Sequence, residues 1–157
     1  MFRELMRGKQ ALSPGECLQL LETEKRGVLS VNGDGGYPYG MPMNHLFLDG
    51  ILYFHCGREV GHRLDALRRD GRASFCLYDG GYREAGKWPL HVRSVIVFGR
   101  IEIVEDPARV VTVAEALCRK FTEDEAYIRA EIEAHAARTL LLAMTPEHIC
   151  GKRVVES

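Results

Sequence analysis

The sequence predicts a mainly β protein of the α+β class, an antiparallel barrel of about six strands with short peripheral helices. Apolar runs with the alternation of strands follow one another along the chain, with short turn signals between them. The helical segments are short and do not alternate regularly with strands, as they would in a parallel sheet. With 157 residues, of which 46% are hydrophobic, the chain can bury one core, and we expect a single domain over residues 1–157.

The first element is a helix that begins near Ser13. Ser13 suits the N-cap, Pro14 the first helical position, and Glu16 completes a capping box. Apolar residues at helical spacing continue to Leu21, and Gly27 marks the end of this region.

Strands follow. Residues 28–31 lead into a turn cluster at 32–36, and residues 37–48 form a long strand that contains Pro38 and Pro42. Proline donates no hydrogen bond to a neighbouring strand, so this strand is expected at a sheet edge or at a bulge.

Asp49-Gly50 is a two-residue hairpin signal that joins this strand to the next one, residues 51–54. A short helix is expected over residues 60–69, ended by Gly71, and residues 73–78 return to strand.

An irregular loop over residues 80–89 contains Trp88 and leads into the longest strand, residues 91–104, with Gly99 as a bulge. Asp106-Pro107 begins a second helix, and Thr122-x-x-Glu125 has the spacing of a capping box that begins a third. A last strand is expected over residues 139–144.

Composition narrows the classes of partner. The formal net charge of −1 gives no general attraction to nucleic acid, and no apolar run approaches the ~20 residues that span a bilayer. The N-terminus lacks the apolar stretch of a signal peptide, and the five scattered cysteines form no C-x-x-C pair. We therefore expect a soluble cytoplasmic protein without nucleic-acid or membrane partners.

The stretch LYFHCGREVGHRLDAL (residues 52–67) has the features of an anion-binding loop. Gly57 and Gly61 flank a loop that leads directly into a helix, where unpaired backbone N–H groups favour a phosphate. His62 and Arg63 add donors. The alternative is an ordinary solvated basic helix face that continues through Arg68 and Arg69.

Four blocks resemble the pyridoxamine-5′-phosphate-oxidase-like flavoproteins, the FMN-binding split β-barrels, and within them the 5-nitroimidazole-resistance or flavin-nucleotide-binding branch. In chain order the blocks are YPYGMPMNHLFLDGILYFH, LYFHCGREVGHRLDALRRDGRASF, RSVIVFGRIEIVED and EHICGKRVVE. Their order and spacing are those of that branch. The resemblance implies a split barrel, and an FMN bound between the two subunits of a homodimer.

The resemblance also implies which residues contact the cofactor. The backbone of one strand follows the edge of the flavin ring, the end of the next strand lines the ribityl and phosphate side, and the glycine-basic turn receives the phosphate. These residues are Pro42, Met43, Asn44 and His45, then Phe54 and His55, then Gly61, His62 and Arg63, with Arg93 and Ser94 close by. Many relatives have lysine where Arg63 stands; arginine keeps the charge. Trp88 either covers the flavin or substrate or plugs the end of the barrel.

His45 is the candidate for catalysis, because a histidine beside the flavin could donate a hydrogen bond to it or protonate a substrate. A buried structural role is the alternative, and His55 is the weaker candidate. No metal is expected, since His45, His55, Cys56 and His62 lack the spacing of a metal finger. The positive surroundings of Cys56 could lower its thiol pKa.

The leading hypothesis is an FMN-dependent oxidoreductase that takes electrons from a donor such as a reduced nicotinamide and passes them to a small acceptor, of which a nitroimidazole is one candidate. No G-x-G-x-x-G fingerprint is present, so a nicotinamide would bind only transiently. A flavin carrier or sensor without turnover remains the alternative. Pyridoxamine-phosphate oxidation has only Lys152 and Arg153 for a second phosphate, and deazaflavin or haem in place of FMN stays open.

Overall fold

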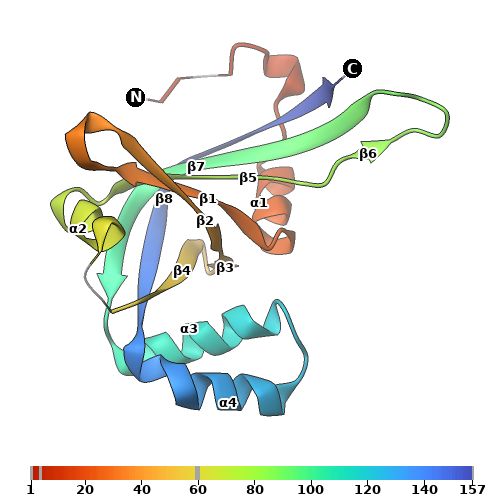
Figure 1. The fold of residues 1–157 in the computed structure, drawn as a ribbon. Helices are drawn as coiled ribbons and strands as arrows, with labels where there is room; N and C mark the ends of the chain where they lie inside the picture. The colour runs from red at the N-terminus through yellow and green to blue at the C-terminus, as the bar shows by residue number, and fades with distance from the viewer. Residues whose placement is uncertain (1, 4, 59–60, 157) are drawn as a thin grey trace.

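The computed structural model of this chain describes residues 2–3, 5–58 and 61–156, and its main element is one curled antiparallel sheet (Figure 1). The strands run in the order β2-β1-β5-β7-β8-β4-β3, and β6 pairs with β7. Their bounds are β1 (Arg26–Asn32), β2 (Pro38–Asn44), β3 (Leu46–Leu48), β4 (Ile51–Gly57), β5 (Arg72–Tyr78), β6 (Tyr82–Arg83), β7 (Leu90–Val104) and β8 (Thr139–Glu156).

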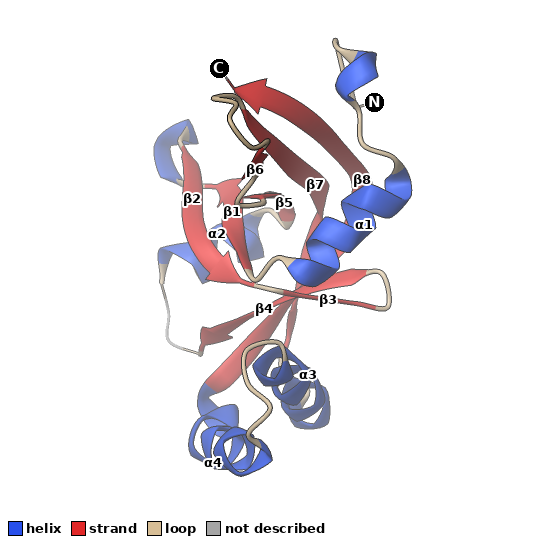
Figure 2. Ribbon diagram, turned by 90° about the vertical axis from the view of Figure 1, so that its right-hand side faces the viewer, coloured by secondary structure: helices blue, strands red, loops and turns tan. Residues whose placement is uncertain are grey.

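Four α-helices and three 3₁₀ helices surround the sheet. They are α1 (Pro14–Thr23), α2 (His62–Arg69), α3 (Pro107–Arg119), α4 (Glu125–His135), η1 (Gly8–Gln10), η2 (Asp34–Gly36) and η3 (Ala136–Arg138). Figure 2 shows α1 along one side of the sheet, while α3 and α4 form a pair below it in both ribbon views. This arrangement is the antiparallel split barrel that the sequence predicts.

Two short strands of the described sheet, β3 and β6, differ from the predicted pattern. The run expected over residues 37–48 is broken at His45, which separates β2 from the three-residue β3. The loop expected over residues 80–89 contributes the two-residue β6. The main strands lie where alternation placed them, although β8 continues well beyond Met144.

Local turn and edge chemistry is confirmed. The Ser13–Glu16 capping box begins α1, and Asp49 and Gly50 both have positive φ, as a tight hairpin turn requires. β2, with its prolines, is an edge strand. β7 and β8 change register between Phe98 and Gly99. At this point the backbones approach so closely that a side chain at Gly99 would collide with the carbonyl oxygen of Thr145, so glycine is required there.

The core fills the inside of the curled sheet. Phe54 of β4 and Phe75 of β5 meet edge to face with ring centroids 5.0 Å apart, and Leu20, Leu21 and Leu64 bring α1 and α2 against them. A smaller cluster, which includes Tyr53, Val104, Val110, Val113, Leu141 and Ala143, joins α3 to the lower sheet.

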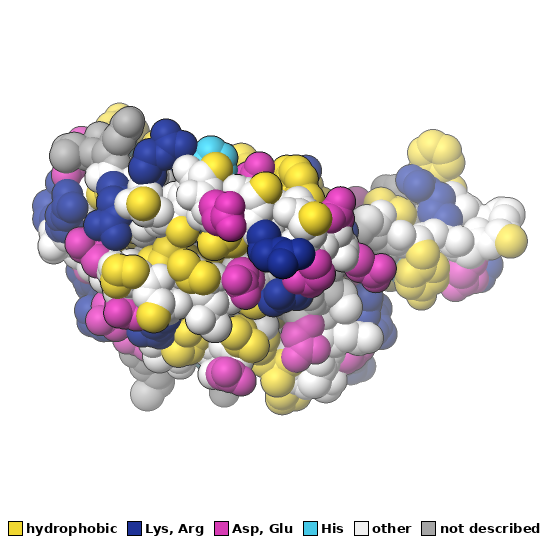
Figure 3. All heavy atoms as spheres, turned by 90° about the horizontal axis from the view of Figure 1, so that it is seen from below, with side chains coloured by type: hydrophobic (Ala, Val, Ile, Leu, Met, Phe, Trp, Pro, Cys, Tyr) yellow, Lys and Arg dark blue, Asp and Glu magenta, His cyan; other side chains and the backbone are white. Residues whose placement is uncertain are grey.

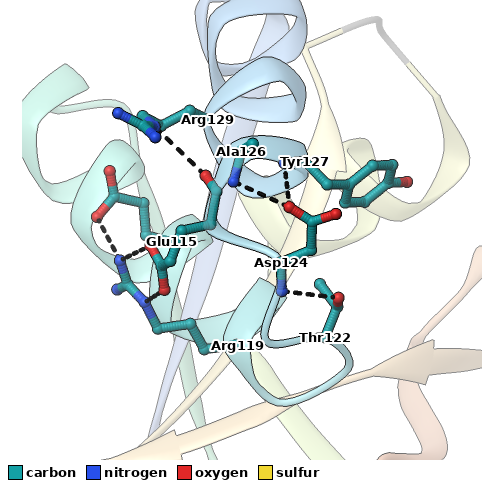
Figure 4. Close-up of polar contacts among 8 residues, drawn as sticks. Glu115, Arg119, Thr122, Asp124, Ala126, Tyr127 and Arg129 are labelled. Carbon is teal, nitrogen blue, oxygen red and sulfur yellow. Dashed lines mark hydrogen bonds and ion pairs between the residues drawn. The ribbon is translucent and has the colours of Figure 1, made fainter.

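Two helix starts differ from expectation. α2 begins at His62 with Gly61 as its N-cap, and residues 59–60, which the sequence placed in the loop and first helical turn, lie outside the described residues. α4 is capped by Asp124, whose carboxylate accepts from the backbone of Ala126 and Tyr127 (Figure 4). The predicted Thr122 capping box is therefore wrong.

Asp124, which directly precedes the first residue of α4, caps the helix in place of Thr122. Thr122 only accepts from the backbone N–H of Asp124, and Glu125 forms an ion pair with Arg119 at 2.8 Å, which ties the two ends of the α3–α4 turn together. In the described part of the chain, no helix is both long enough and apolar enough to cross a membrane.

Candidate functional site

The first turn of α2 directs the guanidinium of Arg63 into a cavity of about 460 Å³. The cavity is lined by Arg26, Pro42, Met43, Asn44, His55 and Arg63. Arg63 Nη1 lies 3.8 Å from the Met43 sulfur, a weak contact, and the buried Nε has no hydrogen-bond partner among the described residues. A buried donor without a partner costs free energy, so Nε of Arg63 is free to donate a hydrogen bond to a further acceptor.

The start of α2 strengthens the positive character of this place. Gly61 has an extended backbone and supplies no side-chain cap. The first N–H groups of a helix have no intrahelical acceptor and carry partial positive charge. The described lining of the cavity contains the side chains of Arg26 and Arg63 and no carboxylate. An anion of phosphate size is the ligand that suits this combination.

The charge of Arg63 affects the pKa values of His55 and Cys56, at the end of β4. Loss of solvation lowers the pKa of His55, and the Arg63 guanidinium lowers it further, so the ring is neutral at pH 7. Burial raises the pKa of the Cys56 thiol more than Arg63 lowers it. Arg63 thus lowers the pKa of Cys56 as expected, but burial outweighs this effect and the net pKa is raised.

His62 turns away from the cavity. Its Nε2 accepts from the backbone N–H of Asp34 at 3.3 Å and lies 3.3 Å from an oxygen of the Asp34 carboxylate. Its ring stacks on Tyr39 with centroids 4.2 Å apart. Successive helical residues point about 100° apart, which explains why Arg63 reaches the cavity and His62 does not.

His45 lies in the core of the chain, which corrects its placement beside a substrate. Its side chain is 0% exposed, and its Nε2 lies 2.8 Å from the carbonyl oxygen of Leu21. Burial and the charge of Lys120 lower its pKa to about 4. Met41 is buried and Met43 packs partly against the core, and His45 continues this side of the chain just beyond the end of β2.

Lys120, at the end of α3, holds this core histidine in place. Its ammonium donates to the carbonyl oxygens of Leu21 and His45 at 3.4 and 3.3 Å. Burial lowers its pKa to about 8. Lys120, which is half-buried, and the buried His45 therefore link α1, α3 and the break between β2 and β3.

The remaining predicted contacts divide into two groups. Asn44 lines the Arg63 cavity, where its Oδ1 accepts from Arg26 Nε at 2.9 Å, whereas the side chain of Phe54 is fully buried in the core. Because β4 alternates, Phe54 points inward and its neighbour His55 outward. Sequence reasoning missed Arg26, since its place opposite Asn44 depends on the register of β1 and β2.

Arg93, Ser94 and Trp88 lie on or beside β7 and do not line the Arg63 cavity. Arg93 Nε pairs with the carboxylate of Asp79 at 2.8 Å. Trp88 is 78% exposed and lies beside the Arg83 guanidinium. In a single chain these three residues are thus separate from Arg63.

The outer face of the sheet connects the Arg63 cavity with the predicted cofactor contacts on β7. We use this name for the surface of Val28, Cys76, Tyr78, Ile96 and Ser94 on β1, β5 and β7, which the strand registers place side by side. Val28 and Tyr78 are 41% and 69% exposed. Pro42 pairs with Val28, so the Arg63 cavity opens at the margin of this face.

The described residues contain no cluster of three or more His, Cys, Asp or Glu side chains that could hold a metal ion. A second, larger cavity that sequence reasoning also missed lies between the end of β4 and the α3–α4 pair. It depends on how two helices stand against a distant strand, for which the sequence carries no local signal.

The chain matches a family model described as pyridoxamine 5′-phosphate oxidase over residues 13–153. A comparison with curated proteins found no match. Among solved structures, a conserved hypothetical protein from Mycobacterium tuberculosis is similar with a TM-score of 0.79 and 22% identity, over 95% of this chain and 90% of that one.

Two further solved structures share the fold. A Bacteroides thetaiotaomicron protein provisionally assigned to 5-nitroimidazole antibiotic resistance has a TM-score of 0.76 and 17% identity, over 92% of this chain and 87% of that one. An FAD and heme binding protein from Mycobacterium smegmatis has a TM-score of 0.72 and 24% identity, over 92% and 72%.

Proposed function

This chain belongs to the pyridoxamine 5′-phosphate oxidase family, and we propose that it is an FMN-dependent oxidoreductase that reduces a small acceptor. The observation that carries the proposal is the buried Nε of Arg63 at the start of α2, which has no hydrogen-bond partner in the described part of the chain. A phosphate monoester would supply the missing acceptor, and its charge would offset the two arginines of the cavity.

The residues present fit FMN at its phosphate end. Arg63 and the first backbone N–H groups of α2 would hold the phosphate oxygens. Asn44 and Met43, at the end of β2, and His55, at the end of β4, would line the path from the phosphate toward the ring. The bound flavin would supply two-electron redox chemistry, and these side chains would orient it and exclude water.

The proposed assembly is a homodimer that uses the outer face. An exposed apolar sheet face is typical of an interface, and Val28 and Tyr78 leave such a face uncovered in one chain. Arg93, Ser94 and Trp88 lie too far along β7 to line the Arg63 cavity of their own chain. They would contact FMN only from a second copy docked on this face.

The electron donor and acceptor follow from the cofactor. A reduced nicotinamide is the proposed donor, and a nitro compound such as a nitroimidazole is the proposed acceptor. The similarity in fold to the Bacteroides protein supports this choice of acceptor.

A flavin carrier or sensor is the second candidate, and one observation favours it. Of the two histidines expected near the flavin, His45 is buried in the core and His55 has a lowered pKa. Burial therefore disfavours the protonated, proton-donating form of both rings, whereas acid–base chemistry prefers a group whose pKa lies near the working pH.

The visible spectrum of the purified protein tests the cofactor, and the mass of the ligand released on denaturation distinguishes FMN from FAD, deazaflavin and haem. Anaerobic mixing with NADH or NADPH then tests turnover, because bleaching of the flavin band followed by reoxidation on adding metronidazole is the expected result. A flavin that is never reduced by either nicotinamide points to the carrier. A colourless protein that does not bind added FMN would refute both.

A further inference from the structure

The second cavity has a volume of about 740 Å³ and lies between the end of β4 and the α3–α4 pair. Its lining includes Leu117 and Phe121 from α3 and the turn after it, Ile132 from α4, and His55 from β4. A volume of this size suits a drug-sized organic molecule. The FMN proposed above does not use it.

The cavity exists because the two helices pack unequally. α3 buries Val110, Val113 and Leu117, whereas α4 has Ile128 as its one buried residue among those described. α4 therefore stands off from the sheet and leaves space beside α3. The Asp124 cap and the Arg119–Glu125 ion pair hold the turn between the helices (Figure 4).

The walls are mostly apolar. Ala114, Leu117, Phe121, Ile132 and Ala136 contribute hydrocarbon surface. Tyr127 also lines the cavity. Its side chain and the Arg119 ion pair lie on opposite sides of the start of α4 (Figure 4). Seen from below, hydrophobic side chains gather on this face of the molecule between charged ones (Figure 3). Walls of this kind favour a ligand with a flat aromatic ring.

The charges at the rim favour a negative group on that ligand. Arg58 and Arg138 line the cavity with a single carboxylate, Glu131. Glu131 lies 3.7 Å from His135 Nε2, and Arg138 Nη2 lies 2.8 Å from His135 Nδ1. Arg58 lies 3.7 Å from Glu105, a loose contact between exposed groups. Among the side chains that line the cavity, two guanidinium groups therefore face one carboxylate.

The two cavities meet at Asn44 and His55, which line both. A molecule in the larger cavity would therefore lie next to the cavity that Arg63 lines. We infer that the larger cavity is a substrate site, and that it takes a planar aromatic compound with one acidic group. This inference rests on the proposed function for its role as a substrate site, but the binding of such a compound does not require the flavin.

The test measures binding of 1-anilinonaphthalene-8-sulfonate, an aromatic monoanion with a flat naphthalene ring system, whose fluorescence rises in apolar surroundings. Ala114→Trp fills the cavity from α3, and Ala130→Trp, on an exposed position of α4 outside the lining, is the matched control. We expect about a tenfold weaker Kd in the first variant and an unchanged Kd in the second. Ala137→Trp fills the cavity from another wall and serves if Ala114→Trp does not fold.

The charge preference has its own comparison. Arg138→Gln should weaken binding of this probe about fivefold, while Arg129→Gln, on α4 outside the lining, should not. The neutral analogue N-phenyl-1-naphthylamine should bind with equal affinity to both variants. Equal affinity of both variants for the anionic probe would overturn the assignment of an acidic ligand.

The flavin spectrum, recorded on the same samples, separates this inference from the proposed function. Probe binding that Ala114→Trp weakens as predicted while flavin content stays at the wild-type level supports a separate substrate site. Loss of flavin in Ala114→Trp, or displacement of flavin by the probe, would show that the cavity belongs to the cofactor and overturn the inference. If the protein lacks flavin but the cavity binds the probe as predicted, the proposed function fails and the ligand assignment stands.

Discussion

Arg63 and Met43 meet in the lining of the cavity at the end of β2, with Nη1 3.8 Å from the sulfur and Nε without a partner in residues 2–3, 5–58 and 61–156. A thioether is a weak acceptor, so this contact leaves most of the hydrogen-bonding capacity of the guanidinium unused. The pair connects the start of α2 with the strand that the family resemblance places along the flavin edge. The first prediction follows from it.

Arg63→Ala should weaken FMN binding by roughly 1.5–3 kcal/mol, the range for a hydrogen bond to a charged group. Titration of the flavin-free protein with FMN, followed by flavin fluorescence, measures the effect. Arg68→Ala is the control, because Arg68 is exposed on the same helix and pairs with Asp65 at 3.6 Å. Equal losses in both variants would mean that the helix contributes only general positive charge.

His45 should make the protein sensitive to acid. Its pKa is about 4 in the folded chain and about 6.5 when unfolded, so the unfolded state binds the proton more readily. Its contribution to stability is complete above pH 6.5 and is lost as the pH falls toward 4, by roughly 3 kcal/mol. Urea unfolding at several pH values should show this decline.

The matched variants for this decline are His45→Gln, which should flatten it, and His62→Gln, which should not. An unchanged decline in His45→Gln would show that other groups cause the acid sensitivity. His62 suits the control because it is exposed and lies on the other side of α2, against Asp34 and Tyr39.

Gly99→Ala should lower the free energy of unfolding by about 2 kcal/mol, since a methyl group there collides with the carbonyl oxygen of Thr145 at the register shift of β7 and β8. Gly57→Ala is the control, because a side chain at Gly57 would meet nothing within 4 Å. Chemical denaturation measures both. A neutral Gly99→Ala would mean that the bulge relaxes without cost.

Val28→Arg should disrupt the proposed homodimer, because it places a charge on the exposed apolar surface of the outer face. Sedimentation should then show a monomer, and flavin content should fall with it. Leu18→Arg, on an exposed position of α1, should leave both unchanged. A Val28→Arg variant that remains dimeric and keeps its flavin would exclude this face as the interface.

The sequence predicted the elements whose causes are local. The Ser13 cap, the Asp49-Gly50 turn, the edge position of the prolines and the bulge at Gly99 each depend on a few neighbouring residues. The start of α4 was mistaken, since Thr122 and Asp124 are both good capping residues and the pattern does not rank them.

What the sequence by itself determined is the order of strands and helices and the place of Arg63 at a helix start. Only the tertiary structure decided which side chains meet. The curl of the sheet and the register of distant strands turned His45 into the core, set Arg26 beside Asn44 and opened the cavity under α4. Contacts between distant segments depend on how the whole sheet bends, and no short stretch of sequence carries that information.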